Sequence, residues 1–361
     1  MSDKADVKFH LRHEELTERI YKNPDMLPSR YVFVLTNLCN LKCPFCCQAK
    51  TNASERMTAD MWISFAAQIP DYARITLTGG EPLLFKDLEK VFTFVVNRNP
   101  CNIISNGVLL SDKIIEILLS HPNFKVLSVS LDDIGNKSRN MTDSQWNSLV
   151  ANLKSFNVAK KSKNHAALLD IKTMILDGNA FELLNIHRFC VEELECGTHV
   201  FQFLKGSEIQ HSDHMFSFDN IKEIPNDYRY KNWNVIVQQL EKVRLYNRER
   251  GCQPLSFMHP RMVDLNSSEI LPDFSCLNAP GLDSAFFTSC KFPWSSVHIN
   301  YDGNLFPCLA VSMGNIKESS LRDIIFGKKM KEFRNYILAN GLAGACKRCG
   351  WLRPVETGVE K

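Results

Sequence analysis

Three cysteines, Cys39, Cys43 and Cys46, lie within eight residues of one another, shortly after the apolar run Tyr31 to Leu35. The run predicts a buried strand, and open α/β sheets bind their ligands at the carboxyl ends of strands. Three thiolates cannot complete a four-iron cluster, because such a cluster takes four protein ligands. The spacing therefore indicates an iron–sulfur cluster in which one iron is left open for a second ligand.

The residues alone leave three other uses for these cysteines open. A zinc site usually adds a second cysteine pair, and the nearest such pair, Cys346 and Cys349, lies some three hundred residues further along. A disulfide needs an oxidising compartment, and a buried apolar thiol is the third alternative. The spacing of three and then two residues, with Phe45 before the third cysteine, favours the cluster.

A second group of four cysteines lies near the C-terminus. Cys290 and Cys308 flank an Asp-Gly hairpin signal at residues 302–303, and Cys346 and Cys349 form a C-x2-C pair. Four thiolates complete either an iron–sulfur cluster or a zinc site, and the residues do not separate the two.

Composition limits the class of protein. The chain has 361 residues, 44% of them hydrophobic and 23% charged, which is typical of a globular protein with more than one domain. A net charge of +3 is too small to indicate nucleic acid or a membrane surface as a partner. No apolar run approaches the ~20 residues of a membrane span. Thirteen cysteines without a signal peptide predict a reducing, cytoplasmic location.

Alternating strands and helices predict an α/β fold. Six strands are expected at 31–36, 74–78, 101–105, 126–132, 167–176 and 199–204, with helices at 57–69, 86–97, 111–120, 144–156 and 180–194. Consecutive βα units of this kind form a parallel sheet with right-handed crossovers. Because a closed barrel takes eight units, the sequence predicts a partial (β/α)6 barrel.

The expected organisation has four parts. Residues 1–30 form an N-terminal leader with a short helix at 13–21, and residues 31–205 form the barrel. Residues 206–289 contain a linker helix at 233–250 and an otherwise irregular, substrate-facing insert. Residues 290–361 form a small cluster-binding domain, built of a β-hairpin and a helix.

Polar residues follow the ends of the central strands. Gly79 and Gly80 would let a ligand approach the backbone, and the carboxylate of Glu81, before Pro82, could accept a bond from an ammonium group. The stretch could equally be an ordinary turn. The next two strands end in hydrogen-bonding side chains that could instead be turn residues or helix caps, namely Asn106, Ser128, Ser130 and Asp132. Lys172 and Gln202 could face either the barrel interior or the helices.

Six cysteines remain outside the two groups, namely Cys47, Cys101, Cys190, Cys196, Cys252 and Cys276. Cys252 and Cys276 lie in the predicted insert, where a thiol could donate a hydrogen atom to a substrate radical. For either residue the alternative is a bystander thiol. Cys276 could also replace Cys290 as a ligand. Cys101, Cys190 and Cys196 are expected to be buried apolar residues.

The first cysteine motif, with its aromatic residue and the later Gly-Gly-Glu-Pro stretch, resembles the radical S-adenosylmethionine (radical SAM) superfamily. The resemblance implies a [4Fe-4S] cluster that chelates SAM and cleaves it to a 5′-deoxyadenosyl radical. It also implies that the residues from 79 to 82, with Phe45, Asn106, Ser128, Ser130 and Asp132, bind SAM. The C-terminal cysteines resemble a twitch domain, a short form of the SPASM domain, which implies one auxiliary [4Fe-4S] cluster rather than zinc.

The resemblance implies oxidation or epimerisation of a small polar metabolite or a peptide, with electrons from a flavodoxin or ferredoxin. A peptide maturase of ribosomally made peptides is one alternative, with recognition supplied by a separate protein because the leader is short. Methyl or methylthio transfer and GTP cyclisation are less favoured, because a cobalamin domain and the cyclase's C-terminal pattern are not found. An alternative of another class is a non-catalytic zinc-binding scaffold.

Overall fold

The computed structural model describes residues 5–48, 56–223, 228–251 and 255–355. Within these residues a single sheet runs in the order β10-β9-β8-β1-β2-β3-β4-β5-β6-β7. The strands are β1 (Arg30–Val34), β2 (Arg74–Thr78), β3 (Cys101–Ser105), β4 (Phe124–Ser130), β5 (Leu168–Ile175), β6 (Thr198–Phe203), β7 (Leu255–His259), β8 (Ser296–Ile299), β9 (Asn304–Phe306) and β10 (Gly314–Asn315). All neighbours from β8 to β7 pair in parallel, whereas β9 and β10 pair antiparallel at one edge.

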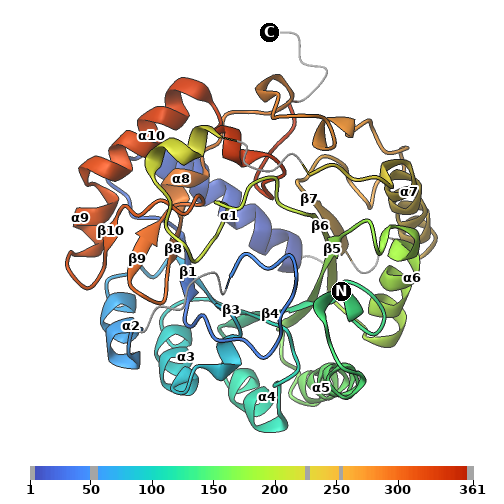
Figure 1. The fold of residues 1–361 in the computed structure, drawn as a ribbon. Coiled ribbons are helices and arrows are strands. Elements are labelled where there is room, and N and C mark those ends of the chain that lie inside the picture. The colour runs from blue at the N-terminus through green and yellow to red at the C-terminus, as the bar shows by residue number, and fades with distance from the viewer. Residues whose placement is uncertain (1–4, 49–55, 224–227, 252–254, 356–361) are drawn as a thin grey trace.

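The helices lie mostly outside the curved sheet (Figure 1). They are α1 (Ala5–Lys22), α2 (Ala59–Ala66), α3 (Leu88–Val96), α4 (Asp112–Leu119), α5 (Asp143–Ser162), α6 (Leu183–Arg188), α7 (Trp233–Glu249), α8 (Phe292–Ser295), α9 (Leu321–Ile325) and α10 (Lys328–Asn340). Thr58, Ser111 and Thr142 cap α2, α4 and α5 by accepting a backbone N–H bond. None of the described helices is long and apolar enough to cross a membrane.

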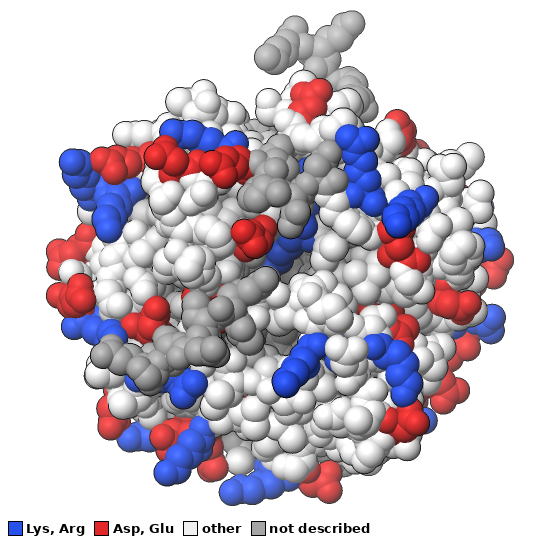
Figure 2. All heavy atoms as spheres, viewed as in Figure 1, with Lys and Arg blue, Asp and Glu red and all other residues white. Residues whose placement is uncertain are grey.

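The partial barrel predicted from the sequence is confirmed, and its interior is polar. On β5, Leu169 and Ile171 pack in the hydrophobic core, so the alternate residues Asp170 and Lys172 face the interior. Lys and Arg are interspersed with Asp and Glu on the face shown in Figure 2, and a hollow near its centre exposes Lys or Arg atoms.

Helix α1 lies against the amino-terminal end of the barrel. A cavity of about 90 Å³ there is lined by residues of α1, including His13 and Leu16, and by Ser29 and Arg74 at the starts of β1 and β2. The Thr17 hydroxyl donates a hydrogen bond of 2.8 Å to Ser295 of α8. The opposite end, where the cysteine loop follows β1, is therefore the accessible end of the barrel (Figure 1).

Three features differ from the expectation. Residues 255–259, expected to be irregular, form β7 and extend the sheet beside β6. Strand β8 of the expected C-terminal domain pairs with β1, so the hairpin continues the barrel sheet, a pairing that the sequence did not predict. The helix expected at 180–194 is divided into a 3-10 turn at Ala180–Glu182, α6, and a π-helical turn at Phe189–Glu193.

Candidate functional site

The Gly-Gly-Glu segment fixes the start of the cysteine loop. The Gly80 N–H donates to the Thr36 carbonyl at 2.7 Å, and the Glu81 N–H donates to the Leu38 carbonyl at 2.7 Å. Leu38 directly precedes Cys39. The end of β2 therefore holds the backbone from which the first cysteine projects.

Close packing explains why two glycines are needed here. A Cβ at Gly79 would lie 2.4 Å from the Thr36 carbonyl oxygen, and one at Gly80 would lie 2.3 Å from that of Leu38. Gly79 also has a φ of +151°, which L side chains rarely adopt. The close approach predicted for a ligand is thus made by the protein's own chain.

The Glu81 carboxylate, expected to bind a ligand, accepts hydrogen bonds from the protein itself. The side chain is fully buried, and its oxygens accept hydrogen bonds from the Ser105 hydroxyl at 2.8 Å and the Asn106 N–H at 2.7 Å. The Leu83 N–H donates to the same carboxylate at 3.1 Å. Glu81 therefore ties the ends of β2 and β3 together beneath the cysteine loop, and the buried Pro82 begins a short 3-10 turn.

Each of the first three thiols is approached by N–H groups. The Leu41 N–H lies 3.4 Å from the Cys39 sulfur, and the Asn106 amide lies 3.9 Å from it. The Gln48 N–H lies 3.4 Å from the Cys46 sulfur. Burial raises the pKa of all three thiols, to about 11 for Cys46, and in each pair one thiol raises the pKa of the other.

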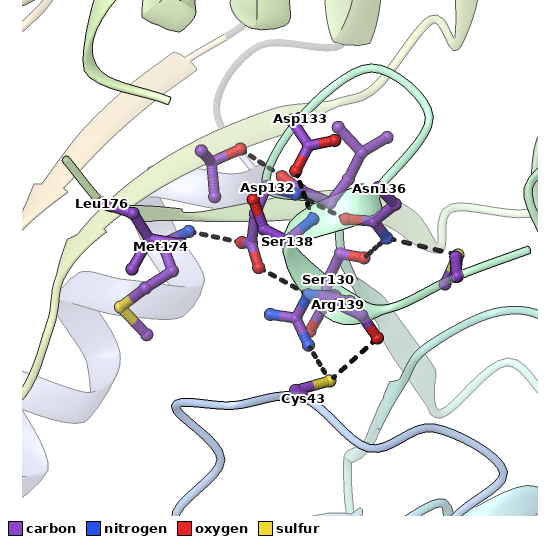
Figure 3. A network of polar contacts seen from close by, with 12 residues as sticks. Cys43, Ser130, Asp132, Asp133, Asn136, Ser138, Arg139, Met174 and Leu176 are labelled. Carbon is purple, nitrogen blue, oxygen red and sulfur yellow. Dashed lines mark hydrogen bonds and ion pairs between the residues drawn. The ribbon is translucent and has the colours of Figure 1, made fainter. Parts of the chain in front are cut away.

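Cys43 contacts a buried ion pair that the sequence analysis missed (Figure 3). Arg139 Nε lies 2.6 Å from the fully buried carboxylate of Asp132, and Arg139 Nη1 lies 3.9 Å from the Cys43 sulfur. The guanidinium also lies 5.4 Å from the centre of the Phe45 ring. Asp132 and Phe45, both expected to bind SAM, contact Arg139 and position it against the cysteine loop. Burial raises the pKa of Asp132, and Arg139 opposes this.

The remaining predicted SAM-binding residues divide into two kinds. Ser128 donates to Asp170 at 2.7 Å inside the barrel, and Asn106 donates to Asn40 at 2.7 Å. Ser130, by contrast, is partly exposed, and its hydroxyl has no partner among the described residues. Ser130 therefore has a hydroxyl free to bind a ligand at the accessible end of β4.

Two residues left open by the sequence face the interior. Lys172 Nζ lies 3.6 Å from Asp170, and Lys172 pairs in register with Ser130 on the neighbouring strand. Gln202 alternates on β6 with Phe201 and Phe203, which pack in the core, so it also faces the interior.

The four C-terminal cysteines come together although their sequence positions span 60 residues. Cys308, Cys346 and Cys349 are buried, and Cys290 is partly buried. Burial raises the pKa of all four thiols, to about 12 for Cys290, and in every pair one thiol raises the pKa of the other. Cys276 is the proposed substitute for Cys290. Burial raises the pKa of its thiol and so do Asp273 and Asp283, whereas none of the four thiols contributes.

The donor set of this second group suits a cluster. Among the described residues, no three His, Cys, Asp or Glu side chains are arranged as ligands of one metal ion. Four thiolates are the ligand count of a complete iron–sulfur cluster, and also of a structural zinc site.

A segment from Lys205 to His211, expected only as a loop, joins the two groups. Lys205 Nζ lies 3.2 Å from the Cys47 sulfur, and the Gln48 amide donates to the His211 carbonyl at 2.6 Å. At its other side, the His211 N–H donates to the Cys308 carbonyl at 3.1 Å. These contacts link residues far apart in sequence, so local patterns could not reveal them.

The other cysteines contribute little to either group. Cys101, Cys190 and Cys196 are buried, which confirms their prediction as apolar residues. Cys276 is partly buried, and its thiol lies 3.9 Å from the Phe274 carbonyl. Cys252, the second candidate hydrogen donor, lies outside the described residues.

Comparison with family models gives two matches. Residues 33–178 match the radical SAM superfamily, and residues 290–350 match SPASM, an iron–sulfur cluster-binding domain. The first match contains the three-cysteine loop, and the second contains all four C-terminal cysteines.

Curated relatives match only part of the chain. A probable GTP 3′,8-cyclase of Archaeoglobus fulgidus is 31% identical over 122 residues, covering 30% of this chain and 40% of the cyclase. The antilisterial bacteriocin subtilosin biosynthesis protein AlbA of Bacillus subtilis is 21% identical over 195 residues, covering 51% of this chain and 42% of AlbA. Each match thus spans less than half of the relative.

Solved structures share the fold over most of the chain. Streptococcus suis SuiB superposes with a TM-score of 0.61 at 16% identity, covering 90% of this chain and 72% of SuiB. Native anSMEcpe with bound AdoMet and Cp18Cys peptide superposes with a TM-score of 0.58 at 14% identity, covering 89% of this chain and 90% of that one.

Proposed function

Because the chain is a radical SAM protein with a C-terminal SPASM iron–sulfur cluster-binding domain, we propose that it abstracts a hydrogen atom from a substrate bound in the barrel. A [4Fe-4S] cluster on Cys39, Cys43 and Cys46 would supply the electron that cleaves SAM to methionine and a 5′-deoxyadenosyl radical. The four C-terminal cysteines would hold an auxiliary cluster that assists electron transfer during an oxidation or an epimerisation.

The observation that carries the proposal is the pairing of a three-thiol group with a four-thiol group in one barrel. The three-thiol group lies at the accessible end and lacks a fourth cysteine ligand in the sequence motif. The four-thiol group has three buried cysteines and one partly buried cysteine, enough thiolates for a complete ligand set. An incomplete ligand set leaves a position for SAM, whereas a complete one suits electron transfer.

The chain's own residues bind and orient the reactants. Asn106 and Arg139 direct N–H groups at the thiols of Cys39 and Cys43 and so position the loop. Ser130 and Lys172, in register on β4 and β5, place a hydroxyl and an ammonium group inside the barrel. We assign to these two residues the binding of polar groups of SAM or of the substrate.

A peptide is the substrate class that we favour. One solved SuiB structure, with a TM-score of 0.60 at 16% identity, contains a bound precursor peptide, SuiA. The relative AlbA is a bacteriocin biosynthesis protein. The protein would then act as a peptide maturase. A small polar metabolite is the alternative substrate, and in both cases the electron donor is proposed to be a flavodoxin or ferredoxin.

The test is formation of 5′-deoxyadenosine from SAM by anaerobically reconstituted, dithionite-reduced protein. The proposal predicts product from the wild type and none from Cys43→Ala. Cys47→Ser is the matched control, because Cys47 lies in the same loop outside the three-cysteine spacing. Equal activity of Cys43→Ala and Cys47→Ser would contradict the ligand assignment.

The zinc-binding scaffold makes the opposite prediction. It requires a colourless protein that binds zinc at the four C-terminal cysteines and forms no 5′-deoxyadenosine. The metal content of protein purified without oxygen therefore distinguishes the radical enzyme, which should contain iron, from the scaffold, which should contain zinc.

A further inference from the structure

Arg30 lies between the segments that carry the four-thiol group. It begins β1, and its guanidinium donates a hydrogen bond of 2.8 Å to Ser296 of β8. It also lies 5.3 Å from the centre of the Trp351 ring, two residues beyond Cys349. The hairpin that starts with β8 leads to Cys308. Each of the two segments that Arg30 contacts therefore carries a cysteine of the group.

No carboxylate among the described residues pairs with Arg30. Burial lowers the pKa of Arg30 to about 10, and the thiols of Cys308 and Cys349 raise it. Arg30 is partly buried, and a partly desolvated cation without a countercharge costs free energy. The negative charge that would offset this cost is therefore that of the thiolates themselves.

Further cations lie near these segments, among them Arg353 and Lys205. Arg353 follows Cys349 by four residues, and Lys205 adjoins Gly206, whose N–H donates to the Lys347 carbonyl at 3.1 Å. Arg353 is already paired with Glu14 at 2.9 Å. Lys205 donates only to the Cys47 sulfur and to the Gln210 carbonyl at 3.1 Å, with no carboxylate partner among the described residues. Arg30 and Lys205 are thus two uncompensated positive charges beside one thiol group.

We propose that Arg30 is the countercharge of an iron–sulfur cluster on Cys290, Cys308, Cys346 and Cys349, and that it raises the reduction potential of this cluster. Lys205 contributes in the same direction. The inference rests on the proposed function, because it takes the four cysteines to hold a cluster rather than zinc.

The direction follows from charge. Four thiolates make the site anionic, and one-electron reduction adds a further negative charge. A guanidinium remains protonated throughout, so its attraction for the site is stronger after reduction than before it. Net charge and hydrogen bonding are among the factors that set iron–sulfur potentials. Arg30 is a positioning and tuning residue, since it acts on the cluster and not on substrate.

The test measures the potential of the second cluster alone. In a Cys39→Ala/Cys43→Ala/Cys46→Ala background, the cluster is titrated potentiometrically and followed by electron paramagnetic resonance. Arg30→Met should lower the equilibrium constant for one-electron reduction of the cluster at least tenfold. This corresponds to a fall of about 59 mV in its reduction potential. Arg30→Lys, which keeps the charge, should recover most of this shift.

Arg74→Met is the matched control. Arg74 begins β2 and pairs in register with Arg30. Burial lowers its pKa to about 9, as do Arg30 and Arg261, and no thiol contributes. The variant should shift the potential less than Arg30→Met does. Should Arg30→Met fail to fold, Lys205→Gln tests the same attraction from a second element, with a fall of the potential expected.

Two results would overturn the inference in distinguishable ways. A cluster whose potential stays unchanged, or rises, in Arg30→Met and Lys205→Gln would refute the tuning role and leave the proposed function standing. Zinc in place of iron in the triple-alanine background would refute the auxiliary cluster itself.

Discussion

At the scale of single residues, the buried pair of Asp132 and Arg139 contacts the cysteine loop at Cys43. The Asp132 side chain is 0% exposed and that of Arg139 is 14% exposed, so neither charge is well solvated. Removing one member of such a pair leaves the other without compensation. The pair therefore stabilises the loop after β4 and holds it against Cys43.

Arg139→Met should lower the free energy of unfolding by about 3 kcal/mol, because it leaves Asp132 buried and unpaired. Denaturant titration of the apoprotein measures this loss. Lys137→Met is the matched control in the same loop. Lys137 and its partner Asp143 are 60% and 87% exposed, and exposed pairs contribute at most about 1 kcal/mol. Equal losses in the two variants would contradict a special role for Arg139.

The sequence predicted the seven cluster cysteines, because their spacing is a local pattern. It did not predict Arg139 or Arg30, whose partners Cys43 and Ser296 are 96 and 266 positions away. It also did not predict the protein contacts of Glu81 and Asp132, since a buried carboxylate that binds protein donors cannot be told by sequence from one that binds a ligand.

At the scale of elements, the end of β2 acts through its backbone. Gly80→Ala would place a methyl group against the Leu38 carbonyl, 2.3 Å away. The cysteine loop would have to move, so we expect iron at the three-cysteine site to be lost and about four irons to remain at the other. Gly178→Ala is the control, because its Cβ would meet no atom within 4 Å. Full iron content in Gly80→Ala would refute this role.

A buried histidine pair links α6 to β6. His187 Nδ1 lies 2.7 Å from His199 Nδ1, and His187 Nε2 lies 2.7 Å from Asn247 of α7. Burial lowers the pKa of His187 from 6.5 to about 4. The folded protein therefore keeps His187 neutral at a pH where the unfolded chain binds a proton.

The stability that depends on His187 should be present above pH 6.5 and lost as the pH falls toward 4. Between these two pH values the free energy of unfolding of the wild type should fall by on the order of 3 kcal/mol more than that of His187→Gln. Denaturant unfolding at pH 7 and pH 4 measures the difference. His214→Gln, at an exposed position, should behave like the wild type. A His187→Gln variant with the wild-type pH dependence would contradict this account.

Six strands were predicted because each is a short apolar run. The parallel pairing of β8 with β1 was not, since it joins residues 30–33 to 296–299 and leaves no trace in either segment. Strand β7 was missed because the surrounding Pro, Gly and Ser residues indicated an irregular insert.

At the scale of the whole molecule, the sheet makes one folding unit of the barrel and the C-terminal hairpin. Tyr31 and Phe33 of β1 are 0% exposed, and β8 covers one edge of their strand. A chain of residues 1–289 should therefore show no cooperative thermal unfolding. A chain of residues 1–355 keeps every described element and should unfold like the full chain. Cooperative unfolding of 1–289 would instead support two separate domains.

The central claim is that the chain holds two [4Fe-4S] clusters, one on three cysteines and one on four. The most direct measurement is the iron and sulfide content of anaerobically reconstituted protein, with Mössbauer spectra to identify the cluster type. We expect about eight irons in the wild type, about four in Cys39→Ala/Cys43→Ala/Cys46→Ala and about four in Cys290→Ala/Cys308→Ala/Cys346→Ala/Cys349→Ala. Wild-type protein with four irons or fewer, or with zinc at the C-terminal cysteines, would contradict the account.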